Sequence, residues 1–190
     1  MKNIAIFVSG NGTNCENIIK HFAGSRDVRV ALVVSNRADS YALTRAARHN
    51  IPTVVIPKSE FGNEAVLMDT LQRHDICFIV LAGFLLMIPD FLVKAYDHRM
   101  VNIHPALLPK YGGKGMYGDR VHEAVIAAGE KESGITIHYT NEHYDEGAII
   151  CQVKCPVLPE DTPDDLAQRI HALEYDTYPK VIEKLLESEG

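Results

Sequence analysis

The chain has 190 residues, of which 46% are hydrophobic and 23% charged, an ordinary composition for a globular protein with one substantial core. Its 19 basic and 25 acidic side chains give a formal net charge of −6 without a basic block, which disfavours nucleic-acid binding. No apolar run approaches membrane-spanning length, so we expect no membrane partner, no signal peptide and a cytoplasmic location.

Residues 1–105 alternate between short apolar runs and helix-like segments, which is typical of repeated βα units. We expect strands at 3–8, 28–34, 53–56, 76–82 and 100–103, and helices ending at 22 and spanning 40–49, 64–74 and 89–96. The run from Ile76 to Ala82 is uninterrupted, which favours a strand covered on both faces. The predicted fold class is α/β, a Rossmann-like, mostly parallel sheet flanked by helices.

The segment Ser9–Asn14 (SGNGTN) links the first strand to the first helix. Its glycines allow a tight turn, and a helix start presents free N–H groups, so the segment predicts an anion cradle suited to phosphate. It is neither a full GxGxxG motif nor a P-loop. The alternative is a plain βα turn with Thr13 or Asn14 as helix N-cap, and we favour phosphate binding.

Two polar residues mark the end of the strand that Pro105 stops. Asn102 and His104 are two residues apart, so both side chains should face the same crevice at the carboxyl edge of a parallel sheet. An amide donor and an imidazole there suit oxyanion stabilisation and proton transfer. Alternatively, Asn102 caps a turn and His104 is a satisfied buried histidine. The Gly-rich segment from Tyr111 to Gly115 that follows favours the functional interpretation.

The second half is expected to add an antiparallel pair to the sheet. After a helix at 119–128, strands at 134–139 and 148–157 are joined by the loop 140–147. A final helix should begin with Thr162 as N-cap and run to about Tyr175, and Pro179 should kink or restart it. No repeat or linker appears, so we expect one domain.

Other residues have two interpretations each. His138, on the alternating strand, and Asp145, in the loop after it, could join the Asn102/His104 pair, where a carboxylate would raise the pKa of an imidazole. A loop aspartate is otherwise simply solvated, and His143 is expected on the surface. Leu85–Ile88 follows a strand end and could be plain core or the wall of a pocket for a flat ring.

The four cysteines are scattered and form no CxxC pair. Only Cys151 and Cys155 lie close in sequence, in a segment that we expect to be a strand. We therefore expect no metal and no disulfide framework, with Cys77 and Cys151 as small core residues.

Five segments, SGNGTN, LAGF, NIHPALLPKY, GITIHY and DEGAII, occur in the order seen in the folate-dependent formyltransferases, and the chain resembles that family over nearly its whole length. The resemblance implies transfer of a formyl group from 10-formyltetrahydrofolate, the co-substrate, to the amine of 5-phosphoribosylglycinamide, a step of de novo purine (IMP) biosynthesis. It further implies small-molecule substrates, a monomer or weak homodimer, and a phosphate-binding half (1–105) followed by a catalytic and folate half (106–190) within one domain, 1–190.

The resemblance also implies three groups of site residues. The catalytic group is Asn102, His104, Asp145 and His138. The substrate-binding group is Gly12, Thr13, Asn14 and Glu174. The cofactor-binding group is Leu85, Leu86, Met87, Ile88 and again Asn102. In the implied chemistry, Asn102 and a protonated His104 donate hydrogen bonds to a tetrahedral oxyanion, and an imidazole tuned by Asp145 exchanges the protons.

Two departures from the family pattern concern the folate side and one loop. Arginines are common in the family at the positions of Asn63 and Leu86, and the loop from Tyr111 to Gly118 differs from the commoner form. Rival functions are a formyltetrahydrofolate hydrolase, a formyltransferase acting on another amine, and a catalytically silent nucleotide-binding module. Hydrolases of the family usually carry an N-terminal regulatory domain, which we expect this chain to lack.

Overall fold

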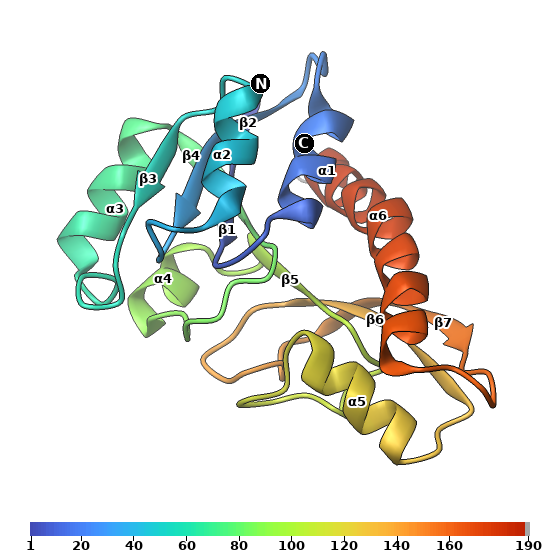
Figure 1. Ribbon diagram of the computed structural model, residues 1–190. Coiled ribbons are helices and arrows are strands. Elements are labelled where there is room, and N and C mark those ends of the chain that lie inside the picture. Colours follow the sequence, from blue (N-terminus) through green and yellow to red (C-terminus); the bar gives the residue numbers. More distant parts are fainter. Residues whose placement is uncertain (189–190) are drawn as a thin grey trace.

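One sheet organises the part of the chain that the computed structural model describes, residues 1–188. Within these residues it has seven strands in the order β3-β2-β1-β4-β5-β6-β7 (Figure 1). The strands are β1 (Lys2–Val8), β2 (Val28–Ser35), β3 (Thr53–Val55), β4 (Ile76–Leu81), β5 (Met100–His104), β6 (Glu132–Tyr139) and β7 (Ile149–Pro156). The first five are parallel, and β6 and β7 are antiparallel additions, so the predicted α/β fold class is confirmed.

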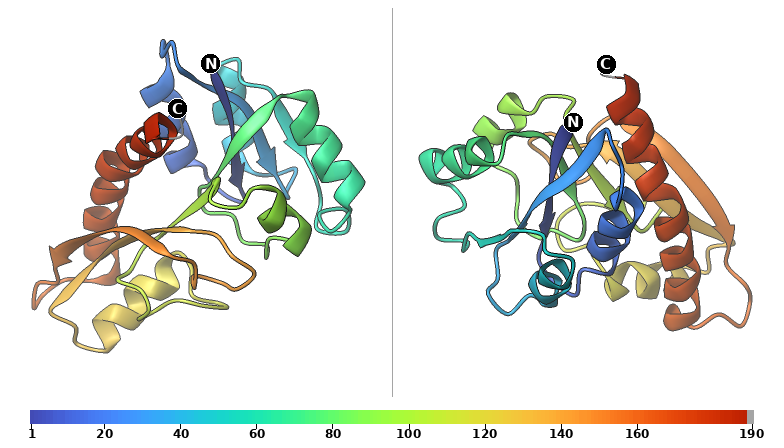
Figure 2. Two further views of the ribbon diagram at one scale, coloured as in Figure 1. Left: turned by 180° about the vertical axis from the view of Figure 1, so that it is seen from behind. Right: turned by 90° about the horizontal axis from the view of Figure 1, so that it is seen from above.

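The helices cover both faces of this sheet, as the buried apolar runs of its strands require. They are α1 (Thr13–Phe22), α2 (Tyr41–Arg48), α3 (Glu64–Arg73), α4 (Asp90–Ala95), α5 (Asp119–Ala127) and α6 (Pro163–Ser188). Helices α1 and α6 lie on one side of the sheet and α3 and α4 on the other (Figures 1 and 2). Side chains of α1, α2, α5 and α6 share one hydrophobic cluster, and those of α3 and α4 share a second. Alternate residues of β1, such as Ile6 and Phe7, point into the two clusters, as the period of two dictates.

The strand order reverses at β1. The chain runs outward from β1 through β2 to β3, then returns to β4 on the other side of β1. A crevice opens at the carboxyl ends of strands where the order reverses. Buried Ser9 holds the two turns there: its N–H donates to Gly83 O over 3.1 Å, and its hydroxyl accepts from Leu85 N over 2.9 Å. The turn after β1 and the loop after β4 therefore meet at one point.

The antiparallel strand β6 pairs with β5 along the edge of the parallel part of the sheet. The register pairs Asn102 of β5 with His138 of β6, and His104 with Thr136. Directly opposed residues of an antiparallel pair lie about 4.5–5.5 Å apart at Cβ. The extension therefore brings His138 beside Asn102.

The last helix differs from the sequence prediction. The expected end at about Tyr175 is wrong, because α6 continues through Pro179 to Ser188. Proline removes the N–H that Tyr175 O would accept from within the helix. Asn17 Nδ2 of α1 supplies a substitute donor to Tyr175 O over 2.9 Å, and α6 lies beside α1 (Figure 2).

The first helix also begins differently. Gly12, with φ of +78°, is its N-cap and makes no side-chain capping bond, so neither Thr13 nor Asn14 is the N-cap that the less favoured alternative required. A Cβ on Gly12 would lie 2.3 Å from Ala42 Cβ, which excludes a larger residue from this turn.

The expectation that Cys77 and Cys151 are small core residues was only partly right. Cys77 and Cys151 are half-buried, whereas Cys15 and Cys155 are buried.

Among residues 1–188, none of the helices combines the length and apolarity needed to cross a membrane.

Tyr178 anchors α6 on the sheet. Its fully buried hydroxyl lies 2.9 Å from Leu81 O and 3.2 Å from Val101 O, so one donor serves two neighbouring strands. We expect Tyr178→Phe to lower the free energy of unfolding by about 1–3 kcal/mol, the usual effect of removing one buried hydrogen-bond partner. Urea unfolding followed by circular dichroism measures this. The control is Tyr175→Phe on the same helix, whose ring is 36% exposed and should lose much less; equal effects of the two variants would contradict the anchoring role.

Candidate active site

One large cavity, of about 640 Å³, lies at the carboxyl edge of the sheet where the strand order reverses. Its wall includes the turn 10–14 after β1, the loop 81–88 after β4, the end of β5, the loop 113–120 and part of the loop between β6 and β7. The volume falls in the range of about 300–1,000 Å³ that is common for small-molecule sites. All the residues expected in the site line this cavity.

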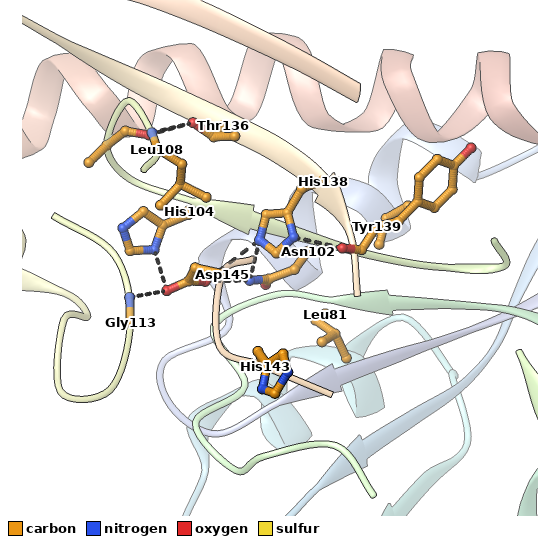
Figure 3. Close-up of polar contacts among 12 residues, drawn as sticks. Leu81, Asn102, His104, Leu108, Gly113, Thr136, His138, Tyr139, His143 and Asp145 are labelled. Carbon is orange, nitrogen blue, oxygen red and sulfur yellow. Dashed lines mark hydrogen bonds and ion pairs between the residues drawn. The ribbon is translucent and has the colours of Figure 1, made fainter. Parts of the chain in front are cut away.

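Asp145 lies at the centre of the polar end of this cavity (Figure 3). Its Oδ1 is 3.4 Å from Asn102 Nδ2 and 3.6 Å from His138 Nε2. Its Oδ2 is 3.4 Å from His104 Nδ1 and accepts from Gly113 N over 3.0 Å. The structure therefore brings the four expected catalytic residues together around one carboxylate.

The loop that carries Asp145 has a constrained backbone. Asp145 itself has a φ of +56°, in the left-handed region. A Cβ on Gly147 would lie 1.6 Å from Tyr139 O, so only glycine permits the loop to approach the end of β6 this closely. The glycine of the DEGAII segment thus serves to hold Asp145 over the strands.

The ring of His104 has an acceptor oxygen beside each of its two nitrogens. Its Nε2 is 2.7 Å from Tyr111 O, and since a carbonyl only accepts, Nε2 carries a proton. In the neutral ring Nδ1, which faces Asp145, is therefore free of a proton. Protonation of Nδ1 creates an ion pair with Asp145, so Nδ1 is the atom of His104 that can take up a proton.

His138 has the complementary arrangement. Its Nδ1 is 2.8 Å from the carbonyl oxygen of Tyr139 and must donate to it. The Nε2 atom of the neutral ring can therefore accept from Asn102 Nδ2, 3.3 Å away. The amide group of Asn102 is thereby oriented by His138 and Asp145 together.

Burial sets the ionisation of this cluster. Desolvation lowers the pKa of His104, which is only 3% exposed, and the opposing effect of the Asp145 charge does not reverse the shift. This differs from the expectation of a raised pKa and a protonated His104, because the sequence showed the carboxylate but not the depth of burial. Desolvation also opposes the charge of Asp145, but the nearby His138 and His104 and the N–H of Gly113 outweigh it, so the pKa of Asp145 is lowered.

Thr136 anchors the loop that follows His104. Its fully buried hydroxyl donates to Ala106 O over 2.7 Å and accepts from Leu108 N over 3.0 Å. These bonds tie the loop that follows His104 to β6. The sequence analysis missed Thr136, although its place two residues before His138 puts it on the same face of the strand.

The cavity is also lined by the turn from Gly10 to Asn14 and by the buried Glu174. Glu174 Oε2 accepts from Asn14 Nδ2 over 2.9 Å and lies 3.2 Å from His171 Nδ1. The hydrogen bond to Glu174 raises the pKa of His171. The structure thus joins Glu174 to the turn, as expected, and adds His171, which sequence reasoning missed although it precedes Glu174 by one helical turn.

Three buried polar atoms of the cavity wall have no hydrogen-bond partner among residues 1–188: Asn14 Oδ1, His122 Nδ1 and Thr140 Oγ1. Burial without a partner normally costs about 1–3 kcal/mol per group, so such atoms suit a polar ligand. His122 is 2% exposed, and burial lowers its pKa. It was also missed, because a lone histidine in a helix resembles ordinary polar surface.

The loop after β4 supplies the apolar wall. Ile88 is buried, whereas Leu85 and Met87 are 41% and 52% exposed, unusual values for side chains of this kind. Leu86 also lines the cavity, and Asn63 instead caps α3 by accepting from Val66 N over 3.3 Å. His143, expected on the surface, is exposed at the cavity wall and lies apart from the catalytic cluster (Figure 3).

No group of three or more histidine, cysteine, aspartate or glutamate side chains among residues 1–188 is arranged to hold a metal ion.

The chain is similar to known proteins over almost its full length. It is 42% identical to phosphoribosylglycinamide formyltransferase, chloroplastic, of Vigna unguiculata, covering 98% of this chain and 61% of the relative. It is 38% identical to phosphoribosylglycinamide formyltransferase of Haemophilus influenzae, covering 96% and 86% of the two chains. The crystal structure of phosphoribosylglycinamide formyltransferase from Anaplasma phagocytophilum matches with a TM-score of 0.90 at 34% identity, covering 98% and 87%.

The chain spans less than two thirds of the length of the plant relative from Vigna, so the extent of the match differs between relatives. The family model for formyl transferases nevertheless matches residues 2–182, which include every residue of the cavity wall. On this match, and on the full-length similarity to the bacterial relatives, the chain belongs to the formyl transferase family.

Proposed function

We propose that the protein transfers the formyl group of 10-formyltetrahydrofolate to the amine of 5-phosphoribosylglycinamide, in de novo purine biosynthesis. The observation that carries this proposal is that one cavity is lined by an anion cradle and a buried acid, by an apolar loop, and by the cluster of Asn102, His104, His138 and Asp145. The names of the relatives from Vigna and Haemophilus support the same assignment.

The anion end suits the phosphoribosyl group. Backbone N–H groups of Gly12, Thr13 and Asn14 start α1 and have no partners within the first helical turn, which favours a phosphate there. Glu174, fixed by Asn14 and His171, can accept from ribose hydroxyls. Asn14 Oδ1 and His122 Nδ1 supply two further polar atoms for the substrate.

The apolar wall suits the folate ring. Leu85, Leu86, Met87 and Ile88 offer a flat apolar surface at the cavity, and the exposed parts of Leu85 and Met87 would be covered by a bound ring. The co-substrate supplies the formyl group, and Asn102 lines the same cavity.

The residues of the cluster can perform the proton transfers that formyl transfer requires. One of the two amide N–H groups of Asn102, which face His138 and Asp145 in the free protein, turns to donate to the oxygen that becomes negative when the amine attacks the formyl carbon. Neutral His104 accepts the proton that the amine must lose at Nδ1, and Asp145 stabilises the resulting imidazolium. His104 then returns the proton to the departing folate nitrogen, directly or through water. Burial keeps His104 neutral beforehand, so it begins the cycle as a base.

The alternative, formyltetrahydrofolate hydrolysis, would use the same cluster with water as the nucleophile. Water needs no binding site of its own at the far end of the cavity. The buried contacts of Glu174 with Asn14 and His171 therefore favour a larger amine substrate over water.

We also propose that residues 1–190 act as one domain. Asn102 and His104 come from the half 1–105 and His138 and Asp145 from the half 106–190, so neither half contains the cluster alone. We further propose a monomer or weak homodimer, testable by sedimentation, and a cytoplasmic location, although the relative from Vigna is named as chloroplastic.

His104→Ala should abolish most activity and preserve the fold. General acid–base catalysis typically contributes about 10²–10⁴-fold, so kcat should fall by that factor. The control is His98→Asn, because the side chain of His98 is 71% exposed and asparagine tolerates its φ of +55°. Turnover is measured beside far-ultraviolet circular dichroism; a folded His104→Ala enzyme with near-normal turnover would remove His104 from the mechanism.

The pH profile should show that neutral His104 is the active form. Burial lowers the pKa of His104 below 6.5, so kcat/KM should stay constant above that pH and fall as the solution becomes more acidic. Asp145 raises the pKa of His104 by its negative charge, so Asp145→Asn should move the acidic limb to lower pH while reducing the plateau. Efficiency that instead rises on acidification would favour a protonated His104.

Phosphate recognition is the decisive test of the substrate. We expect glycinamide ribonucleotide to exceed the corresponding nucleoside in kcat/KM by at least about tenfold for each charge-assisted hydrogen bond lost, since such bonds contribute about 1.5–3 kcal/mol. The comparison is made with the wild-type enzyme at fixed 10-formyltetrahydrofolate and low salt. Equal efficiencies would make SGNGTN a structural turn and point to an unphosphorylated amine.

A further inference from the structure

Arg45 of α2 reaches across to the turn after β1. Its Nε donates to Asn11 O over 2.9 Å, and its Nη2 donates to Asn11 Oδ1 over 3.0 Å. Its Nη1 is 2.5 Å from Glu16 Oε2 on α1. The guanidinium carbon lies 4.9 Å from the ring centroid of Tyr41, which packs against it. Arg45 thus donates hydrogen bonds to both the main chain and the side chain of Asn11.

The start of α2 holds the preceding residue of the turn as well. Gly10 O accepts from Ser40 Oγ over 2.8 Å and from Ala42 N over 3.3 Å. Two consecutive carbonyls, Gly10 O and Asn11 O, are therefore bound by groups from α2 or its N-cap. Ala42 also packs against Gly12 so closely that a Cβ there would collide with it.

The planarity of the peptide unit gives these contacts a consequence for the cavity. In a trans peptide the C=O of one residue and the N–H of the next point in opposite directions. Binding Asn11 O to Arg45 therefore turns Gly12 N–H away from Arg45. Binding Gly10 O likewise turns Asn11 N–H away from α2. A flip of either peptide would replace a donor with a carbonyl oxygen, which repels an anion.

We propose that Arg45 is a positioning residue for phosphate selectivity: it fixes the Asn11–Gly12 peptide so that its N–H faces the phosphate of the substrate. The inference rests on the proposed function, because it assigns a role within the phosphate turn. Arg45 acts through geometry rather than as an anion ligand, because its guanidinium is paired with a carboxylate. Hydrogen bonds from His49 and Arg45 lower the pKa of that carboxylate, Glu16, to about 2, so it is ionised at neutral pH.

The test separates positioning from charge and from simple structural support. Arg45→Met removes both bonds to Asn11, and Arg45→Lys keeps the charge but loses the planar fork that holds two acceptors. Arg48→Met is the matched control, because Arg48 lies on the same helix and also stacks on Tyr41, at 5.6 Å. The measurements are kcat/KM for glycinamide ribonucleotide and its nucleoside, KM for 10-formyltetrahydrofolate, and the melting temperature.

We expect Arg45→Met to lower kcat/KM for the ribonucleotide about tenfold, the size of effect typical for a lost charge-assisted hydrogen bond. Efficiency with the nucleoside and KM for the folate should stay within about twofold, which is the spread typical of a substitution away from both groups. Arg45→Lys should lie nearer to Arg45→Met than to wild type, and Arg48→Met should match wild type.

Three outcomes overturn the inference while leaving the proposed function intact. If the wild type prefers the ribonucleotide and Arg45→Met keeps the same preference, or if it loses efficiency equally with both substrates, Arg45 has no positioning role. If Arg45→Lys restores full selectivity, the charge alone suffices and the geometric argument fails. A wild type without any preference for the phosphate overturns the proposed phosphate site instead.

Discussion

The buried carboxylate of Asp145 is the interaction on which the rest of the site depends. It gathers contacts from two strands and one loop: Asn102 and His104 of β5, His138 of β6, and the N–H of Gly113. A buried charge is stable only when it is surrounded by donors and opposite charge. Asn102 and Gly113 supply donors to Asp145 in the free protein, and His104 Nδ1 becomes a further donor when it is protonated. The catalytic cluster is therefore assembled around this carboxylate before any substrate binds.

The topology of the sheet explains why these segments meet. The reversal of strand order at β1 places the turn after β1 and the loop after β4 around one crevice, and antiparallel β6 then pairs His138 with Asn102. The connection before β6, residues 105–131 with α5, is long enough for a parallel strand as well, so its length does not set the direction of β6. The antiparallel strand allows the loop between β6 and β7 to return over the same edge with Asp145. The antiparallel direction of β6 thus places two of the four cluster residues, His138 and Asp145, beside β5.

Local patterns predicted most of the fold, and tertiary effects account for the differences. The strand ends and the period of two placed Asn102 and His104 on one face from sequence alone. Pro179 misled the prediction because the donor that replaces its missing N–H is Asn17, which lies 162 positions earlier on another helix. The depth of burial that lowers the pKa of His104 is likewise a property of the packed structure. His122 was missed although Val121 and Val125, which flank it by one and three positions, mark the buried face of α5.

The polar groups of the cavity divide into two kinds, and the division indicates how specificity arises. Those of the catalytic cluster have partners, so their geometry is fixed in the free protein. Asn14 Oδ1, His122 Nδ1 and Thr140 Oγ1 have none among the described residues. A substrate that supplies hydrogen bonds to these atoms removes their desolvation penalty, whereas an analogue without the matching polar group leaves it in place. The buried atoms without hydrogen-bond partners therefore select the substrate, whereas the catalytic residues, whose hydrogen bonds are already formed, carry out the reaction.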